Sequence, residues 1–310
     1  MASPKTDSAG GSPRDGVTKQ NISAGSSPAG DPIIAQDENE GDASDSAFGD
    51  DASVSPGITE TCTNGVLQRK LYCFHLIKHP RISQISRTDF ADEHPSVEVI
   101  GTDLSPIQPS WVPPNVKFEL EDATKNWSWP ENYFNLVHVR FLMGAIVDWG
   151  TLFKEPSHCC KPGGFVESGE INPTFYSDDG SIDDVEALQT WNRLVIESGK
   201  GFGRSFTNIE NDVQLFRDAG LVGVQSFDFK VPIGGWPKDE KMRKVGQFLR
   251  ASIENDLEGY TMVVWHQIMH WPEDEYQVFL MNMRKAFKDK RIHGYMRVRY
   301  VYGRKPDADK

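Results

Sequence analysis

Glycine is missing from one stretch of this chain. No glycine occurs between Val66 and Ile100, although 27 glycines are spread over the 310 residues. A glycine-rich loop lets the backbone approach a bound nucleotide closely, and residues with side chains do this less easily. This stretch therefore holds no loop of that kind.

Long apolar runs and basic clusters are also missing. No run of about eighteen apolar residues occurs, so the sequence predicts no membrane-spanning helix and no membrane partner. The N-terminus lacks the apolar core of a secretory signal, so we expect a cytoplasmic protein. Basic residues are not clustered, which argues against a nucleic-acid partner.

Cysteine and histidine do not form a metal-site pattern. The four cysteines, at positions 62, 73, 159 and 160, match no zinc or disulfide framework, in keeping with a reducing compartment. We expect Cys159 and Cys160 to be small apolar residues near the end of a helix. His266 and His270 have the spacing of a helical zinc pair, but Gln267 stands where a zinc protease needs glutamate. The sequence therefore predicts no metal.

The first 60 residues differ from the rest in composition. They are rich in Ser, Gly, Asp, Ala and Pro, and they contain 11 acidic and 3 basic residues. Such a segment buries too little apolar surface to offset the entropy lost on ordering. We therefore expect residues 1–60 to form a disordered acidic tail.

Two short apolar runs each end in an acidic residue. Val97–Ile100 leads through Gly and Thr to Asp103, and Val116–Leu120 leads through Glu to Asp122. Both runs are typical of buried parallel strands, and ligands of open α/β sheets bind at the carboxyl ends of the strands. An acid there can accept hydrogen bonds from ribose hydroxyls or from an exocyclic amine, so the pattern indicates a nucleoside-containing cofactor.

Strands and helices alternate through the rest of the chain. Strands are predicted at 134–140, 165–167, 223–231 and 295–303, a turn at 161–164, and helices at 147–160, 182–198, 209–219, 239–255, 260–270 and 273–288. The alternation predicts an α/β fold whose mostly parallel sheet has helices on both faces. The last strand alternates in polarity, which suits an antiparallel position near an edge. Residues 239–290 then form a helical insertion before it, which we expect to cap a substrate pocket.

Several motifs together resemble a known family. They are Phe90 to Glu119, Asp122-Ala123, Lys161 to Glu167, Tyr176 to Ser181, Val231 to Gly234, and Arg291 to Gly303. As a set, over about residues 88–306, they look like the fungal LaeA-like, or UMTA-type, class I methyltransferases. The resemblance implies a seven-stranded Rossmann-like sheet that binds S-adenosylmethionine. It also implies a role in secondary metabolism or its control, and it adds the nucleus as an alternative location.

The resemblance implies a cofactor-binding role for four residues after the second and third strands. Asp103 would hold the ribose hydroxyls, and Leu104 would pack on the adenine. Asp122 would accept a hydrogen bond from the adenine amine, with Ala123 at the adenine edge. For Asp103 and Asp122 the strand pattern indicates the same roles independently.

Two further residues come from the end of the next strand. By resemblance, His138 and Arg140 would lie beside the methionine end of S-adenosylmethionine. A histidine at a strand end is at least as often a structural hydrogen-bond partner, so both interpretations of His138 stay open.

The chain departs from the family before Phe90. Family members carry a strand and a glycine-rich loop there, and this chain has no glycine at that place. Residues 61–87 are therefore interpreted as an atypical segment ahead of a methyltransferase-like domain at 88–306 and a short tail at 307–310. Either Lys70–Ile77 or Arg81–Ser86 substitutes for the central strand, or the middle of the sheet is damaged.

Three functional hypotheses follow. The first is an S-adenosylmethionine-dependent methyltransferase acting on a small molecule or a protein, with impaired cofactor binding and with a regulatory protein partner as a further expectation. The second is a non-catalytic relic or interaction protein with the same fold, motivated by the missing glycines. The third, a nucleotide-dependent oxidoreductase, uses the same acid but lacks the resemblance. No catalytic residue is predicted, because methyl transfer mainly needs the two reactants held close and aligned.

Overall fold

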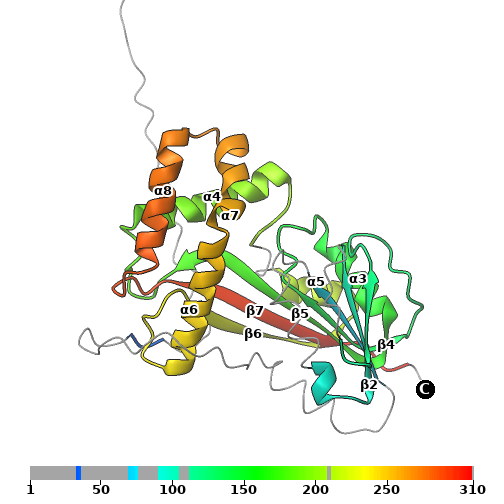
Figure 1. The fold of residues 1–310 in the computed structure, drawn as a ribbon. Coiled ribbons are helices and arrows are strands. Elements are labelled where there is room, and N and C mark those ends of the chain that lie inside the picture. Colours follow the sequence, from blue (N-terminus) through cyan, green and yellow to red (C-terminus); the bar gives the residue numbers. More distant parts are fainter. Residues whose placement is uncertain (1–32, 36–68, 76–89, 105–111, 208–210, 309–310) are drawn as a thin grey trace, which may run out of the picture.

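A computed structural model describes residues 33–35, 69–75, 90–104, 112–207 and 211–308 (Figure 1). Its centre is a seven-stranded sheet in the order β3-β2-β1-β4-β5-β7-β6. The strands are β1 (Arg69–His75), β2 (Val97–Asp103), β3 (Val116–Leu120), β4 (Phe134–Arg140), β5 (Cys160–Tyr176), β6 (Val222–Pro232) and β7 (Tyr295–Arg304). Strands β1 to β5 pair in parallel, and β7 is antiparallel to both β5 and β6. The predicted α/β sheet with an antiparallel last strand is confirmed.

The central strand is present, so a damaged middle of the sheet, one of the three alternatives left open, is wrong. Strand β1 pairs with β2 on one side and with β4 on the other. It lies within Lys70–Ile77 except for its first residue, Arg69, while Arg81–Ser86 lies outside the described residues. The sequence LYCF is rich in strand-forming residues, and a parallel strand needs no glycine of its own. The missing glycines concern the residues that follow, 76–89, which also lie outside the described residues.

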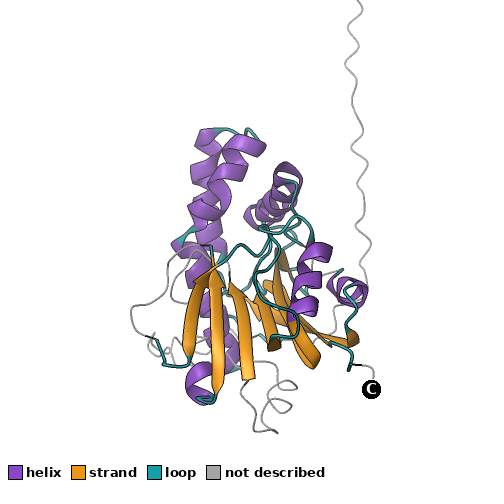
Figure 2. Cartoon of the chain, turned by 90° about the vertical axis from the view of Figure 1, so that its right-hand side faces the viewer, coloured by secondary structure: helices purple, strands orange, loops and turns teal. Residues whose placement is uncertain are grey.

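The first core lies between one face of the sheet and two helices. Helix α3 (Trp149–Cys159) begins at Asp148, whose side chain accepts a hydrogen bond from the Thr151 amide at 3.0 Å. Helix α5 (Asp212–Asp218) packs beside it, with Phe216 fully buried against Phe153. Figure 2 shows helices on both sides of the sheet.

Strand β5 begins earlier than the sequence indicated. The predicted turn at Lys161–Gly164 is wrong, because these residues belong to the strand, which follows α3 without a loop. The strand is irregular here: its register against β4 shifts between Phe134 and Leu136, and Gly163 has a positive φ of 76°. The glycines thus accommodate a bulge rather than a turn.

A second core gathers the helices that the sequence places before the last strand. They are α6 (Glu240–Asn255), α7 (Leu257–Val263), a π-helical turn η2 (Val264–Ile268) and α8 (Glu273–Ala286), and α4 (Glu186–Phe202) joins them. The glycine-rich stretch at residues 199–203 ends α4, with Gly203 as a left-handed C-cap. Aromatic rings fill this core, with Trp265 against Trp271, Tyr276 and Phe279.

Two long strands connect the cores. Strand β5 contributes Val166 to the first core and Phe175 to the second, and β7 contributes Val301 and Met296 in the same way. Figure 1 shows both strands running from the β4 side of the sheet to the helices α4, α6 and α8. The two cores therefore share one sheet.

A short N-terminal segment contacts the loop before α6. Ala35 forms an antiparallel bridge with Pro237, and the Lys238 amide donates to the Ile34 carbonyl oxygen at 2.7 Å. The rest of the predicted tail, residues 1–32 and 36–60, lies outside the described residues. Over the described part of the chain, no helix is both long and apolar enough to cross a membrane.

Candidate functional site

The carboxyl ends of four parallel strands meet at one edge of the sheet. Arg140, the last residue of β4, pairs with His75, the last residue of β1. On the other side of β1, Phe74 pairs with Thr102, so Asp103 lies level with His75. Asp103 and Arg140 thus flank the end of the central strand, two strand spacings or roughly 10 Å apart. Ligands of open α/β sheets bind at this edge.

Asp103 and Leu104 lie on the β2 side of the edge. Asp103 is 6% exposed, and its carbonyl oxygen accepts a hydrogen bond from the Glu121 amide at 3.1 Å. This bond ties the chain after β3 to the end of β2. Leu104 is 54% exposed, so the residue after the acid offers open apolar surface.

Asp122 and Ala123 follow β3 and differ in accessibility. The Oδ1 atom of Asp122 accepts hydrogen bonds from the amide and the hydroxyl of Thr124, at 2.9 and 2.7 Å. These bonds lower the pKa of the carboxyl group, the side-chain bond most, and so favour a charged acceptor. Ala123 is 4% exposed and packs in the first core beside Trp127. Its side chain is therefore turned to the core, and only its backbone is left for a ligand.

His138 is bound to a buried carboxylate on the next strand. Its Nδ1 atom lies 2.7 Å from Oε1 of Glu167, which is directly opposite it on β5. The side chain of Glu167 is 1% exposed and that of His138 is 18% exposed. The other carboxylate oxygen of Glu167, Oε2, is buried and has no hydrogen-bond partner in the described structure. The hydrogen bond that the structural interpretation of His138 requires is thus present.

Arg140 lies two residues further along β4, on the same face of the sheet as His138. Its guanidinium carbon is 4.6 Å from the ring centre of Phe141. Its Nε atom is buried and makes no hydrogen bond to any described residue. A buried donor and a buried acceptor are therefore left open at this end of the site.

Glu170 fixes the loop that leaves β4. Its two carboxylate oxygens accept hydrogen bonds from the amides of Leu142 and Met143, at 2.9 and 3.1 Å. Burial raises the pKa of this carboxyl group to about 8, against the lowering effect of the two amides. Phe141, at the start of the loop, has a φ of 53°, which is uncommon for a residue with a side chain. The two hydrogen bonds to the buried acid tie the start of this loop to β5.

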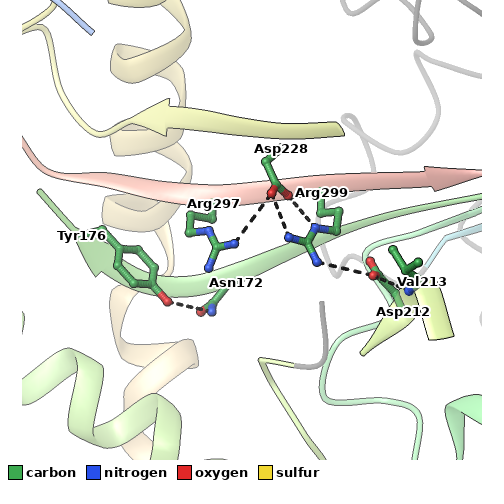
Figure 3. A network of polar contacts seen from close by, with 7 residues as sticks. All are labelled: Asn172, Tyr176, Asp212, Val213, Asp228, Arg297 and Arg299. Carbon is green, nitrogen blue, oxygen red and sulfur yellow. Dashed lines mark hydrogen bonds and ion pairs between the residues drawn. The ribbon is translucent and has the colours of Figure 1, made fainter. Parts of the chain in front are cut away.

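A network of charged side chains lies further along β5 and β7, on the face of the sheet to which Glu170 points (Figure 3). Asp228 on β6 accepts two hydrogen bonds from Arg299, at 2.5 and 2.8 Å, and lies 3.9 Å from Arg297. Arg299 also lies 3.6 Å from Asp212, whose pKa burial raises to about 6. The network joins β6, β7 and the start of α5, and so stabilises the sheet next to the loop after β4.

Glu167 and Glu170 were not predicted as site residues. Both belong to the run FVESGE in a strand that is otherwise buried and apolar. Charged residues in such a run are rarely fully buried without a partner, and that is the signal that identifies them. Their partners, His138 and the loop amides, become neighbours only because β5 pairs with β4. The sequence alone does not predict this pairing.

Known proteins that are similar to this chain are methyltransferases. A family model described as "Methyltransferase domain" matches residues 88–226. "Methyltransferase pytC" of Aspergillus terreus is 28% identical over 216 residues, which cover 69% of this chain and 66% of that protein. "Probable methyltransferase tdiE" of Emericella nidulans is 29% identical over 219 residues, covering 71% and 68%.

A regulator of secondary metabolism is also among the relatives. "Secondary metabolism regulator laeA" of Emericella nidulans is 26% identical over 220 residues, covering 70% of this chain and 59% of that protein. The matched part is 59% to 68% of the length of these relatives. The chain is thus similar to fungal methyltransferases over the larger part of its length, and its sheet with the antiparallel last strand is in keeping with that similarity.

Proposed function

We propose that the chain is an S-adenosylmethionine-dependent methyltransferase. The observation that carries the proposal is the edge of the sheet at which Asp103 and Arg140 flank the end of β1, within a domain related to methyltransferases. S-adenosylmethionine, when bound, supplies a methyl group on a sulfonium that is ready for transfer.

The residues at this edge offer suitable contacts for the ribose and the adenine of that cofactor. Asp103 would accept from the ribose hydroxyls, and Leu104 offers exposed apolar surface for the adenine ring. Asp122, kept charged by its bonds to Thr124, would accept from the adenine amine. The orphaned Nε of Arg140 and Oε2 of Glu167 are polar atoms that a ligand can satisfy.

The chain's contribution to catalysis is positioning. Methyl transfer is an in-line displacement, so its rate depends on holding the acceptor close to the methyl group and aligned with it. Glu170 fixes the loop after β4 at the place where the acceptor would approach. Helices α6 to α8 would close over it and select the acceptor, a small molecule or a protein. Relatives named for secondary metabolism support a role there. We further propose a cytoplasmic or nuclear location and a regulatory protein partner.

A non-catalytic protein with the same fold is the second candidate. It is favoured by the absence of glycine between Val66 and Ile100, where the family's loop approaches the cofactor. It predicts an intact sheet with no affinity for S-adenosylmethionine.

Calorimetric titration of the full chain with S-adenosylmethionine separates the two candidates. We expect binding by the wild type, weakened about tenfold or more by Asp103→Ala, since hydrogen bonds to a charged group contribute roughly 1.5–3 kcal/mol. Glu98→Ala is the matched control, because Glu98 lies on the same strand but pairs with Lys117 at the surface. Absence of binding by a folded wild type would support the non-catalytic candidate.

A further inference from the structure

A short segment from the N-terminal part of the chain lies on the loop before α6. Ala35 forms an antiparallel bridge with Pro237, and the Lys238 amide donates to the Ile34 carbonyl oxygen at 2.7 Å. Figure 1 shows this segment, in blue, beside the yellow loop. The chain is therefore anchored to the folded domain immediately before its acidic residues 37–51.

Basic side chains gather around the same loop. Residues 238–244 and 288–291 contain seven basic and three acidic residues, whereas the whole chain has a net charge of −12. The two stretches lie close together, because Trp236 Nε1 donates to the Gly294 carbonyl oxygen at 3.0 Å and the Trp236 ring centre is 5.1 Å from that of His293. We call the basic residues of these stretches the basic surface: Lys238, Lys241, Arg243, Lys244, Lys288, Lys290 and Arg291, of which only Arg243 is half-buried and the others are exposed.

The acids within these stretches leave the basic surface with an excess of positive charge. Asp239 caps α6 by accepting from the Met242 amide at 2.8 Å. Glu240 and Asp289 each pair with one base of the surface, at 2.9 and 2.7 Å. Cations at the start of a helix oppose its dipole, so α6 itself gains nothing from Lys241 and its neighbours. An anionic partner would compensate this charge.

The sequence that follows the anchored segment has the opposite charge. Residues 37–51, which lie outside the described residues, contain seven acids and no base. The first of them, Asp37, is two residues from Ala35, and attachment at such a short distance gives a high effective concentration. A single exposed ion pair contributes little to stability, but a set of several charges contributes more.

We propose that the basic surface binds the acidic segment 37–51 of the same chain. The acidic segment is then a ligand of the domain, held by the bridge at Ala35 on one side and by charge on the other. No residue of the sheet edge that carries Asp103 and Arg140 takes part, so the proposal is independent of the proposed function.

Cleavage by a glutamate-specific protease tests this on the full 310-residue chain. Glu38 and Glu40 lie in the acidic segment, and Glu60 lies outside it as an internal reference. Lys241→Glu combined with Lys288→Glu should raise the ratio of cleavage at Glu38 and Glu40 to cleavage at Glu60 by roughly fivefold, because a bound segment is cut only while it is released. Sodium chloride at about 1 M should raise the ratio similarly in the wild type, since it shortens the Debye length to about 3 Å.

A matched control separates local from general charge effects. Lys154→Glu combined with Lys200→Glu changes the net charge equally at exposed positions of α3 and α4, and should leave the ratio unchanged. An equal rise in this control would overturn the proposal. So would equal ratios in the wild type and in Lys241→Glu with Lys288→Glu.

Protein concentration identifies the occupant. Binding within one chain predicts a ratio that is independent of concentration, whereas a ratio that falls as concentration rises would assign the acidic segment of a second copy and overturn the proposal. Should the double variant fail to fold by circular dichroism, the salt dependence of the wild type decides: an unchanged ratio at about 1 M salt overturns the proposal.

Discussion

At the scale of the residue, two glutamates three positions apart on β5 have opposite surroundings. Side chains alternate along a strand, so Glu167 and Glu170 point to opposite faces of the sheet. Glu167 contacts an imidazole on β4, and Glu170 accepts from two loop amides. Each is nearly inaccessible, at 1% and 5% exposure. One strand therefore supports the end of β4 from both faces.

The pH dependence of stability tests the state of Glu170. Burial raises the pKa of this carboxyl group from 4.5 to about 8 in the folded protein. The folded state therefore holds a proton that the unfolded state releases, so the wild type should lose stability as pH rises from about 4.5 through about 8. Glu170→Gln cannot ionise and should lose less over the same range. Urea unfolding of both proteins at several pH values measures the difference.

One outcome of the urea experiment would contradict this prediction. Parallel stability curves for the wild type and Glu170→Gln would mean that Glu170 ionises alike in both states. The two amides would then compensate fully for its burial. Glu170 would then be charged over this pH range and would accept hydrogen bonds from the two loop amides as a carboxylate.

At the scale of the element, the sequence was most informative where strands end in acids. Asp103 and Asp122 lie where the apolar runs placed them, and Asp239, whose side chain caps α6, marks a predicted helix start. Strand pairing was harder to predict, because it joins residues far apart in the chain. The partner of His138 is 29 positions away, and the bulge at Gly163 has the same glycine signature as a turn.

Hydrogen exchange tests the central strand directly. Strand β1 is paired on both sides, whereas β3 pairs only with β2 among the described strands. We expect the amides of residues 71–74 to exchange more slowly than those of β3, because an interior strand opens only with the sheet. Mass spectrometry of peptides from both strands measures this. Faster exchange in 71–74 than in β3 would restore the interpretation of a damaged sheet.

At the scale of the whole molecule, the two cores are joined through β5 and β7. Each strand buries residues in both cores, so unfolding of these strands in one core also removes them from the other core. Buried tryptophans lie in both cores, with Trp127, Trp129 and Trp149 in the first and Trp191 and Trp265 in the second.

This arrangement predicts one unfolding transition. Urea curves followed by tryptophan fluorescence and by far-ultraviolet circular dichroism should coincide, as expected for a cooperative two-state change. Trp149→Phe removes a reporter of the first core, and Trp265→Phe removes one of the second. If the fluorescence and circular dichroism transitions separate within either variant, the cores unfold independently and the shared strands do not couple them.

The insertion of α6 to α8 between β6 and β7 has an evolutionary consequence. These helices bury their aromatic rings in the second core, whose residues do not include Asp103 or Arg140. Substitutions in the helices can accumulate without disturbing the edge that carries these two residues. Under the proposed function, a lineage of such proteins could therefore change its methyl acceptor and keep the same residues for binding the cofactor.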